Sequence, residues 1–135
     1  MHQFEHKIRV RYVECDQMQF VHHSVYASYF EEARTEVLRN IGMIYSVMEQ
    51  EGIIMPVRQM NIKYHYAARY DDVLKIVVRM KNIPVLKCEL EYEVYNQKDE
   101  LLTTAEMILF FAKKDTLRPM RLPSKYIQIM EEHLN

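Results

Sequence analysis

The spacing of apolar residues changes partway along the chain, and this change constrains the fold more than any other feature of the sequence. Between Ser24 and Gly42, apolar residues recur every three or four positions, which predicts one long helix with a single buried stripe. From Pro56 onward the spacing becomes two, as expected of strands with one buried face. One helix followed by consecutive strands is typical of the α+β class, in which the helix packs on one face of an antiparallel sheet.

The predicted strands are short and separated by turns. They cover residues 6–13, 56–64, 74–80, 88–94 and 101–111. Because the last four follow one another with only short turns between them, we expect a meander. The segment 101–111 is apolar on both faces, which indicates an interior strand. After Pro123 and Ser124, apolar residues up to Leu134 predict a short C-terminal helix.

The long predicted helix also has recognisable ends and a charged face. Ser24 is the expected N-cap residue, and Gly42 is expected just past the C-terminal end. On the side away from the buried stripe we expect a solvated surface made of Glu31, Glu32, Arg34, Glu36 and Arg39.

The composition excludes several classes of protein. A chain of 135 residues suits one domain spanning residues 1–135, and 49% hydrophobic with 27% charged residues excludes a disordered chain. A net charge of −1 gives no reason to expect nucleic acid or membrane insertion. Without an apolar run long enough for a membrane helix or a signal-like N-terminus, we expect a cytoplasmic location. Cys15 and Cys88 form no CxxC pair, which disfavours a zinc ribbon or disulfide scaffold.

Residues 12–26, YVECDQMQFVHHSVY, gather acidic, thiol and imidazole groups just before the predicted helix. A metal site is disfavoured because the adjacent His22 and His23 point in different directions in either a strand or a helix. A nucleophilic Cys15 is also disfavoured, because its two acidic neighbours would raise the pKa of the thiol. Neither chemistry is therefore predicted for this stretch.

Two interpretations of Asp16 remain open on physical grounds. A carboxylate in the loop before a helix can approach an electrophile held at the helix N-terminus, where unpaired N–H groups favour a developing oxyanion. In the other interpretation, Asp16 only accepts hydrogen bonds from the loop backbone and the histidines are surface residues.

The same stretch resembles the signature of the hot-dog-fold acyl-CoA thioesterases of the 4-hydroxybenzoyl-CoA thioesterase type, including the Tol-Pal-associated branch. The matching positions are Tyr12, Glu14, Cys15, Asp16, Phe20, Val21, His22, His23, Ser24 and Tyr26. Residues 29–39, 56–72 and 117–123 are also similar to family segments, in the expected order. The resemblance implies a hot-dog fold, in which an antiparallel sheet of about five strands wraps around one long helix and a short C-terminal helix follows.

By the same resemblance, the chain is an acyl-CoA thioesterase that releases free acid and coenzyme A without a metal or other cofactor, as a homodimer or homotetramer. Asp16 would be the nucleophile or general base, and the backbone N–H of His23 would polarise the thioester carbonyl. Coenzyme A phosphates would bind in a basic cluster around residues 113–121, which otherwise is a solvated surface. The expected substrate-binding residues are Tyr26, then Val57, Arg58, Gln59 and Met60 of the neighbouring chain, and Lys113, Lys114 and Arg118.

Three positions depart from the family pattern. The loop glycine is missing and leaves Met18 and Gln19 in its place, the usual asparagine before Tyr26 is Val25, and the usual threonine is Cys15. These changes motivate an alternative function, a non-catalytic acyl-CoA or lipid-binding protein of the same fold. A hot-dog hydratase is disfavoured, because the Asn-Pro pair of such hydratases is absent from residues 17–21.

Overall fold

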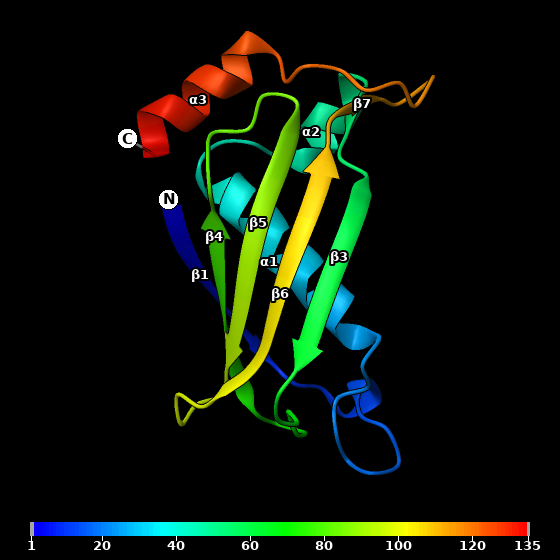
Figure 1. The fold of residues 1–135 in the computed structure, drawn as a ribbon, viewed down its shortest axis with the longest axis vertical. Helices are drawn as coiled ribbons and strands as arrows, with labels where there is room; N and C mark the ends of the chain where they lie inside the picture. Colours follow the sequence, from blue (N-terminus) through cyan, green and yellow to red (C-terminus); the bar gives the residue numbers. More distant parts are fainter. Residues whose placement is uncertain (1, 135) are drawn as a thin grey trace.

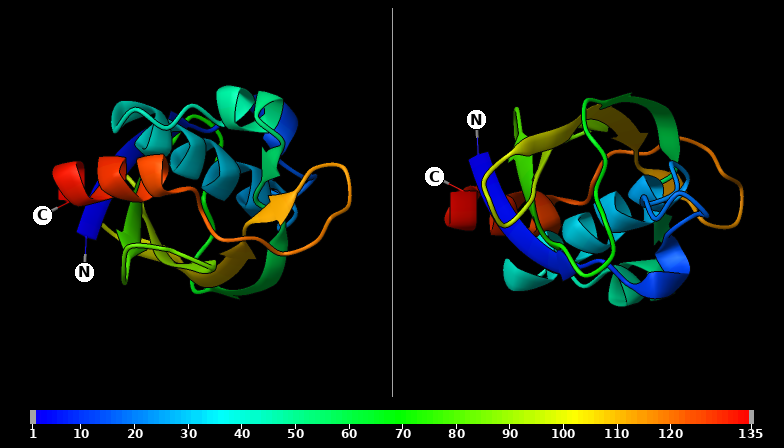
Figure 2. Two further views of the ribbon diagram at one scale, coloured as in Figure 1. Left: turned by 90° about the horizontal axis from the view of Figure 1, so that it is seen from above. Right: turned by 90° about the horizontal axis from the view of Figure 1, so that it is seen from below.

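In a computed structural model, which describes residues 2–134, five strands form one sheet and the helix α1 (Val25–Asn40) lies against one of its faces (Figures 1 and 2). The order across the sheet is β1-β4-β5-β6-β3, and all neighbours pair antiparallel. The strands are β1 (His2–Arg9), β3 (Val57–Tyr64), β4 (Val73–Met80), β5 (Lys87–Tyr95) and β6 (Leu101–Phe110). The predicted α+β arrangement is confirmed.

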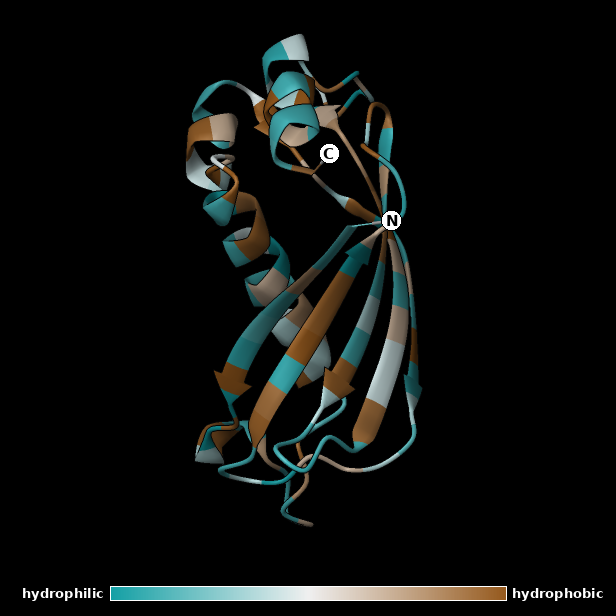
Figure 3. Cartoon of the chain, turned by 90° about the vertical axis from the view of Figure 1, so that its left-hand side faces the viewer, coloured by the Kyte–Doolittle hydropathy of each residue, from teal (hydrophilic) through white to brown (hydrophobic). Residues whose placement is uncertain are grey.

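The strand boundaries agree with the predicted alternation, except at the N-terminal strand. β1 begins at His2, four residues before the predicted start at residue 6, and it ends at Arg9 instead of continuing to Val13, because Tyr12–Glu14 form a short 3-10 helix, η1. The N–H of Arg11 donates to Oε1 of Glu14 at 2.8 Å, which closes this turn. Figure 3 shows the alternation of apolar and polar residues along the strands.

The position of β3 corrects the predicted meander. β3 pairs with β6 and not with β4, so it forms an edge of the sheet, and the chain crosses to the other half between Tyr64 and Val73. This crossing segment is fixed by backbone bonds, since the N–H of Val21 donates to Ala68 and that of Val10 to Asp72, at 2.9 and 2.8 Å. Placing β3 beside β6 encloses β6 between two strands, as its two-sided apolar pattern predicted.

Helix α1 carries the predicted stripe to the core. Its buried residues are Tyr26, Tyr29, Phe30, Ala33, Val37 and Leu38. The ring of Phe30 packs on that of Tyr92 from β5, with 4.4 Å between centroids. Gly42 follows the helix with a φ of +94°, a conformation that glycine adopts without strain.

Arg34 corrects the prediction of a fully solvated charged face. Its side chain is half-buried, and Nη1 lies 3.3 Å from Sδ of Met107 on β6. Since Arg34 is only about 100° around the helix from the buried Ala33, it lies on the flank of the stripe and reaches back over the sheet.

The remaining elements lie at one end of the molecule (Figure 1). They are α2 (Tyr45–Gln50), the two-stranded pair β2 (Ile53–Ile54) and β7 (Ala112–Lys113), and α3 (Ser124–Leu134). The predicted C-terminal helix is confirmed as α3. The opposite end carries η1, the loop around Asp16 and the start of α1, so the fold separates two functional regions that the sequence predicted.

Candidate active site

A small hairpin over residues 14–22 leads directly into α1. The N–H of His22 donates to the carbonyl of Glu14 at 2.9 Å, and that of Asp16 donates to Phe20 at 2.8 Å. An antiparallel bridge between Cys15 and Val21 lies between these two bonds. The hairpin therefore holds Asp16 in a fixed position close to the beginning of the helix.

The two oxygens of the Asp16 carboxylate have different surroundings. Oδ1 accepts hydrogen bonds from the N–H groups of Met18 and Phe20, at 2.9 and 3.3 Å. Oδ2 accepts none from residues 2–134, and the side chain is half-buried. One oxygen therefore stabilises the loop, as in the interpretation that Asp16 only accepts hydrogen bonds from the loop backbone, while the other is available to a ligand or a water molecule.

Gln19 keeps the loop in the shape that a glycine would permit. Its φ is +69°, in the left-handed region that residues with a side chain seldom occupy. The N–H of Gln19 donates to the carbonyl of Asp16 at 2.9 Å, which closes the tip of the hairpin. Where the family pattern has a glycine, this loop therefore holds a residue with a side chain in a strained backbone conformation.

The start of α1 presents an unpaired backbone N–H. Within residues 2–134, the N–H of His23 has no hydrogen-bond partner, and the side chain of the N-cap residue Ser24 does not cap the helix. The Ser24 hydroxyl instead lies 2.8 Å from Nδ1 of His22, whose ring lies 4.2 Å from that of His23. The helix N-terminus can therefore donate to a developing negative charge.

Contacts with β3 fix this helix end. The hydroxyl of Tyr64 donates to the carbonyl of His23 at 3.2 Å, and its ring packs edge-on against Tyr26 with 5.3 Å between centroids. Tyr26 is only 2% exposed. Tyr26, which was predicted to bind substrate, therefore lies behind Tyr64 in the isolated chain, and Tyr64 forms the accessible surface.

Glu14 holds the hairpin to α1, a role that sequence reasoning missed. Its Oε1 accepts a hydrogen bond from the hydroxyl of the buried Tyr29 at 2.9 Å. Burial, together with the neighbouring Glu14 carboxylate, raises the pKa of Tyr29 above its ordinary value. The only hint in the sequence was that an acidic residue preceded the helix whose stripe includes Tyr29.

Cys15 remains a thiol, as the sequence predicted. Burial and then the charges of Glu14, Asp16 and Asp72 raise its pKa. Its Sγ donates to the carbonyl of Arg11 at 3.8 Å. Residues 2–134 also contain no group of three histidine, cysteine or acidic residues placed to hold a metal ion.

The other residues predicted to bind substrate lie away from Asp16 within one chain. Val57, Arg58, Gln59 and Met60 are exposed along the part of the edge strand β3 that is farther from Tyr64. The basic residues Lys113, Lys114 and Arg118 surround β7 at the opposite end of the sheet from η1 (Figure 1).

The basic cluster has a defined local structure. The N–H of Lys113 donates to the carbonyl of Arg118 at 2.9 Å, which closes a turn. Lys113 and Lys114 border an open hollow of about 710 Å³, whose rim also carries Glu49, Glu51 and Asp115. The structure thus brings Asp16, His23 and Tyr26 together but does not bring this cluster to them.

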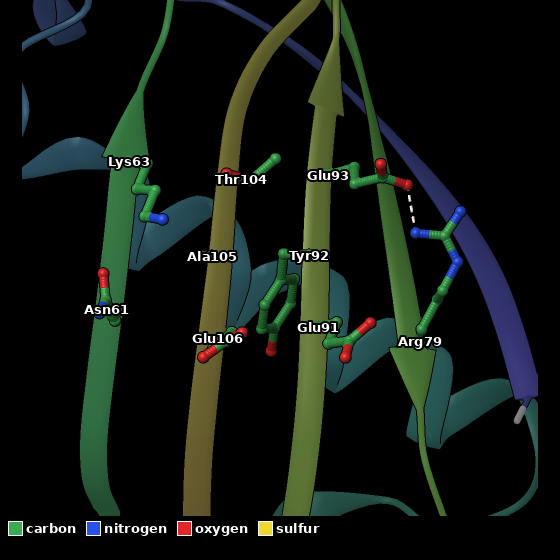
Figure 4. Close-up of a pocket in the computed structure, with 9 residues that line it drawn as sticks. All are labelled: Asn61, Lys63, Arg79, Glu91, Tyr92, Glu93, Thr104, Ala105 and Glu106. Carbon is green, nitrogen blue, oxygen red and sulfur yellow. Dashed lines mark hydrogen bonds and ion pairs between the residues drawn. The ribbon is translucent and has the colours of Figure 1, made fainter.

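A second hollow, of about 290 Å³, lies on the face of the sheet away from α1 (Figure 4). Its lining includes Asn61, Lys63 and Glu106, together with an ion pair between Arg79 and Glu93. None of the predicted site residues lines it, so it is not part of the candidate active site.

Comparisons with known proteins identify the family of this chain. Residues 10–130 match the family described as the thioesterase-like superfamily. The chain is 27% identical over 124 residues to the acyl-CoA thioester hydrolase YbgC of Escherichia coli O157:H7, which covers 92% of both chains. No helix within residues 2–134 is long and apolar enough to cross a membrane.

Solved structures show the same fold. A DHNA-CoA thioesterase from Staphylococcus aureus superposes with a TM-score of 0.92 and 32% identity, over 98% of this chain and 91% of that one. A 4-hydroxybenzoyl-CoA thioesterase superposes with a TM-score of 0.84 and 22% identity, over 96% and 99% of the two chains. The expected hot-dog fold is confirmed.

Proposed function

The chain belongs to the thioesterase-like superfamily, and from this premise we propose that it hydrolyses an acyl-CoA thioester to the free acid and coenzyme A. The observation that carries the proposal is the Asp16 carboxylate, which has one unengaged oxygen and lies in a hairpin that ends at the unpaired N–H of His23. The names of YbgC and of the staphylococcal thioesterase support the same substrate class.

Oδ2 of Asp16 acts on the thioester in one of two ways. As a general base, it takes a proton from a water molecule whose oxygen attacks the acyl carbon; as a nucleophile, it attacks that carbon itself. In both routes the carbonyl oxygen gains negative charge beside the N–H of His23, and the C–S bond then breaks so that coenzyme A leaves as a thiolate and takes up a proton. In the nucleophilic route, water then hydrolyses the mixed anhydride formed with Asp16, which gives the free acid and restores the carboxylate. Mass spectrometry of rapidly quenched enzyme distinguishes the two routes, since only the nucleophilic route gives a transient acyl adduct.

We propose that the complete site needs two chains. Asp16 and the basic cluster lie at opposite ends of the sheet, so one coenzyme A cannot engage both within one chain. An antiparallel two-fold pairing of the free β3 edges places the Val57 end of one strand beside the Tyr64 end of the other. Val57, Arg58, Gln59 and Met60 of the partner subunit then line the pocket facing Asp16.

The same pairing moves the β7 end of the partner subunit toward the start of α1. Lys113, Lys114 and Arg118 of the partner subunit then offer positive charge to the phosphates of coenzyme A. The cytoplasmic location and the choice between dimer and tetramer stay predictions.

The test is thiol release from a panel of aliphatic and aromatic acyl-CoAs. Asp16→Asn should lower kcat by about 100-fold or more, because it removes the base or nucleophile. Asp71→Asn is the matched control, since Asp71 is an exposed carboxylate that pairs with Arg9 and whose backbone N–H donates to Val10, just before η1. Equal rates for wild type and Asp16→Asn would remove Asp16 from the mechanism, and no release from any acyl-CoA would refute the activity.

A non-catalytic acyl-CoA-binding protein is the second candidate. One observation favours it: Oδ1 of Asp16 already stabilises the loop through the N–H groups of Met18 and Phe20. This candidate predicts that acyl-CoA raises the melting temperature without any release of thiol. Detection of several turnovers per chain would exclude it.

A further inference from the structure

Within residues 2–134, the guanidinium of Arg34 is half-buried and has no acidic ion-pair partner. It lies 3.3 Å from Sδ of Met107 and also contacts the buried hydroxyl of Tyr92, and neither of these neutral groups balances its charge. A guanidinium has five N–H donors, and a thioether is a weak acceptor. A partly buried cation in this state is costly, so its partner is expected to come from outside the chain.

Arg34 lies on the flank of α1 that faces the open edge of the sheet. The other side of α1 packs against β1 and β4. Met107, which Arg34 contacts, pairs in register with Met60, near the middle of β3. A two-fold axis that pairs two whole β3 edges passes near the middle of that strand. Arg34 of each copy therefore lies close to the level of this axis, within about one turn of α1.

Glu31 is the available carboxylate on the same side of the helix. It lies one turn before Arg34, about 60° around the helix axis. Glu31 is exposed and has no ion-pair partner within residues 2–134, whereas Glu32 pairs with His6 and Glu36 with Arg39. When a two-fold axis relates two antiparallel helices near residues 32 and 33, position 31 of one helix faces position 34 of the other.

We propose that Arg34 of each copy pairs with Glu31 of the partner subunit, so that this flank of α1 and the β3 edge form one self-complementary interface. The occupant of the surface is a second copy of this chain. Two reciprocal ion pairs per dimer satisfy both guanidinium groups and also separate two like charges that the axis would bring together. The inference rests on the homodimer of the proposed function and adds the charged contact that fixes how the two helices meet.

An ion pair within one helix is the competing explanation, because residues three apart on a helix can also pair. Mixing two charge-reversal variants separates the explanations. Glu31→Arg gives a chain with two positive charges on this flank, and Arg34→Glu gives one with two negative charges. A pair within one chain cannot form in either variant, but both inter-subunit pairs re-form in the mixed dimer.

The experiment measures dimerisation of differently tagged chains by sedimentation and native mass spectrometry. Each variant alone should dimerise about 100-fold more weakly than wild type, because like charges face each other twice. The equimolar mixture should form mainly the mixed dimer. Glu131→Arg, an equal charge reversal at an exposed position of α3, should leave dimerisation unchanged.

Three results would overturn the inference. Folded variants that each dimerise as tightly as wild type exclude the pair, and so does a mixture without preference for the mixed dimer. If Arg34→Glu does not fold, Glu31→Gln tests the same contact, because Glu31 is exposed and its replacement should not disturb folding. It should weaken dimerisation about 10-fold, and an unchanged dissociation constant refutes the contact. A monomeric wild type would refute the proposed dimer itself, whereas a wild-type dimer insensitive to Glu31 refutes only the ion pair.

Discussion

The hydrogen bond from Tyr29 to Glu14 should be one of the main attachments of the Asp16 hairpin to α1. It joins a tyrosine that is 3% exposed to a carboxylate that is 11% exposed, over 2.9 Å. The backbone of Glu14 in turn accepts from His22, two residues before the helix cap Ser24. Tyr29→Phe removes this bond while it preserves the packing of the ring.

The magnitude follows from what remains after the change. Hydrogen bonds to charged groups contribute about 1.5–3 kcal/mol, and the cost is higher when a buried partner is left unpaired. Glu14 keeps the N–H and the guanidinium of Arg11, at 2.8 and 3.2 Å, so it is not left unpaired. We therefore expect a loss of about 1.5 kcal/mol per chain, at the lower end of that range.

Urea unfolding at fixed protein concentration measures this loss. With an m-value of roughly 1.5 kcal/mol/M, the midpoint should fall by about 1 M without a change in slope. Thiol release should fall as well, because the hairpin positions Asp16. Tyr70→Phe is the control, since Tyr70 is 53% exposed and its loss of a hydroxyl should cost under about 0.5 kcal/mol. A midpoint for Tyr29→Phe equal to that of Tyr70→Phe would refute the role of this bond.

Four other changes test separate features. Because folding raises the pKa of Tyr29 above about 10, its stabilisation is complete below pH 10 and falls as the pH rises further, so urea midpoints of wild type and Tyr29→Phe should converge in alkali. In native protein at pH 8, a thiol reagent should label Cys15 slowly and should not label Cys88, whose pKa burial raises to about 12; rapid labelling of Cys88 before unfolding contradicts this. Thr103→Val should change the free energy of unfolding by less than about 1 kcal/mol in thermal melts, since the buried Thr103 hydroxyl lies beside that of Tyr26 but makes no hydrogen bond of ordinary geometry within residues 2–134. Gln19→Gly should stay within about 0.5 kcal/mol of wild type, because relief of strain offsets chain entropy, whereas Gln19→Val should lose more than about 1 kcal/mol in the same melts.

The sequence predicted the elements whose periodicity is long enough to read. The apolar stripe of α1 and the alternation of β4, β5 and β6 repeat over many positions. The buried face of each element could therefore be predicted from the spacing of its apolar residues. The place of β3 could not be predicted in this way, because alternation identifies a buried face but not the neighbouring strand. The helix α2 and the strands β2 and β7 are too short to show a period.

From the sequence, the candidate site could be proposed only through single residues. Asp16 was identified from its place before a helix and from the family signature. The anchors were not, because the contact of Glu14 with Tyr29 spans fifteen positions and leaves no periodic trace. Arg34 was misplaced for a related reason: its residue type indicates a solvated face, whereas its angle around the helix places it on the edge of the buried stripe.

The β3 edge connects assembly to catalysis. Val57, Met60 and Tyr64 are 47%, 40% and 50% exposed there, although Met60 and Tyr64 alternate with polar residues as a buried strand face should. An exposed apolar edge does not stabilise a single chain, and its unpaired backbone groups can pair with strands of other molecules and cause aggregation. In the proposed dimer the same edge extends the sheet and carries the basic cluster of one copy to the Asp16 end of the other. Pairing of the two β3 edges then both covers the exposed apolar edge and completes the site. A variant that only blocks this pairing must therefore lose thioester hydrolysis, even though its own Asp16 hairpin is intact.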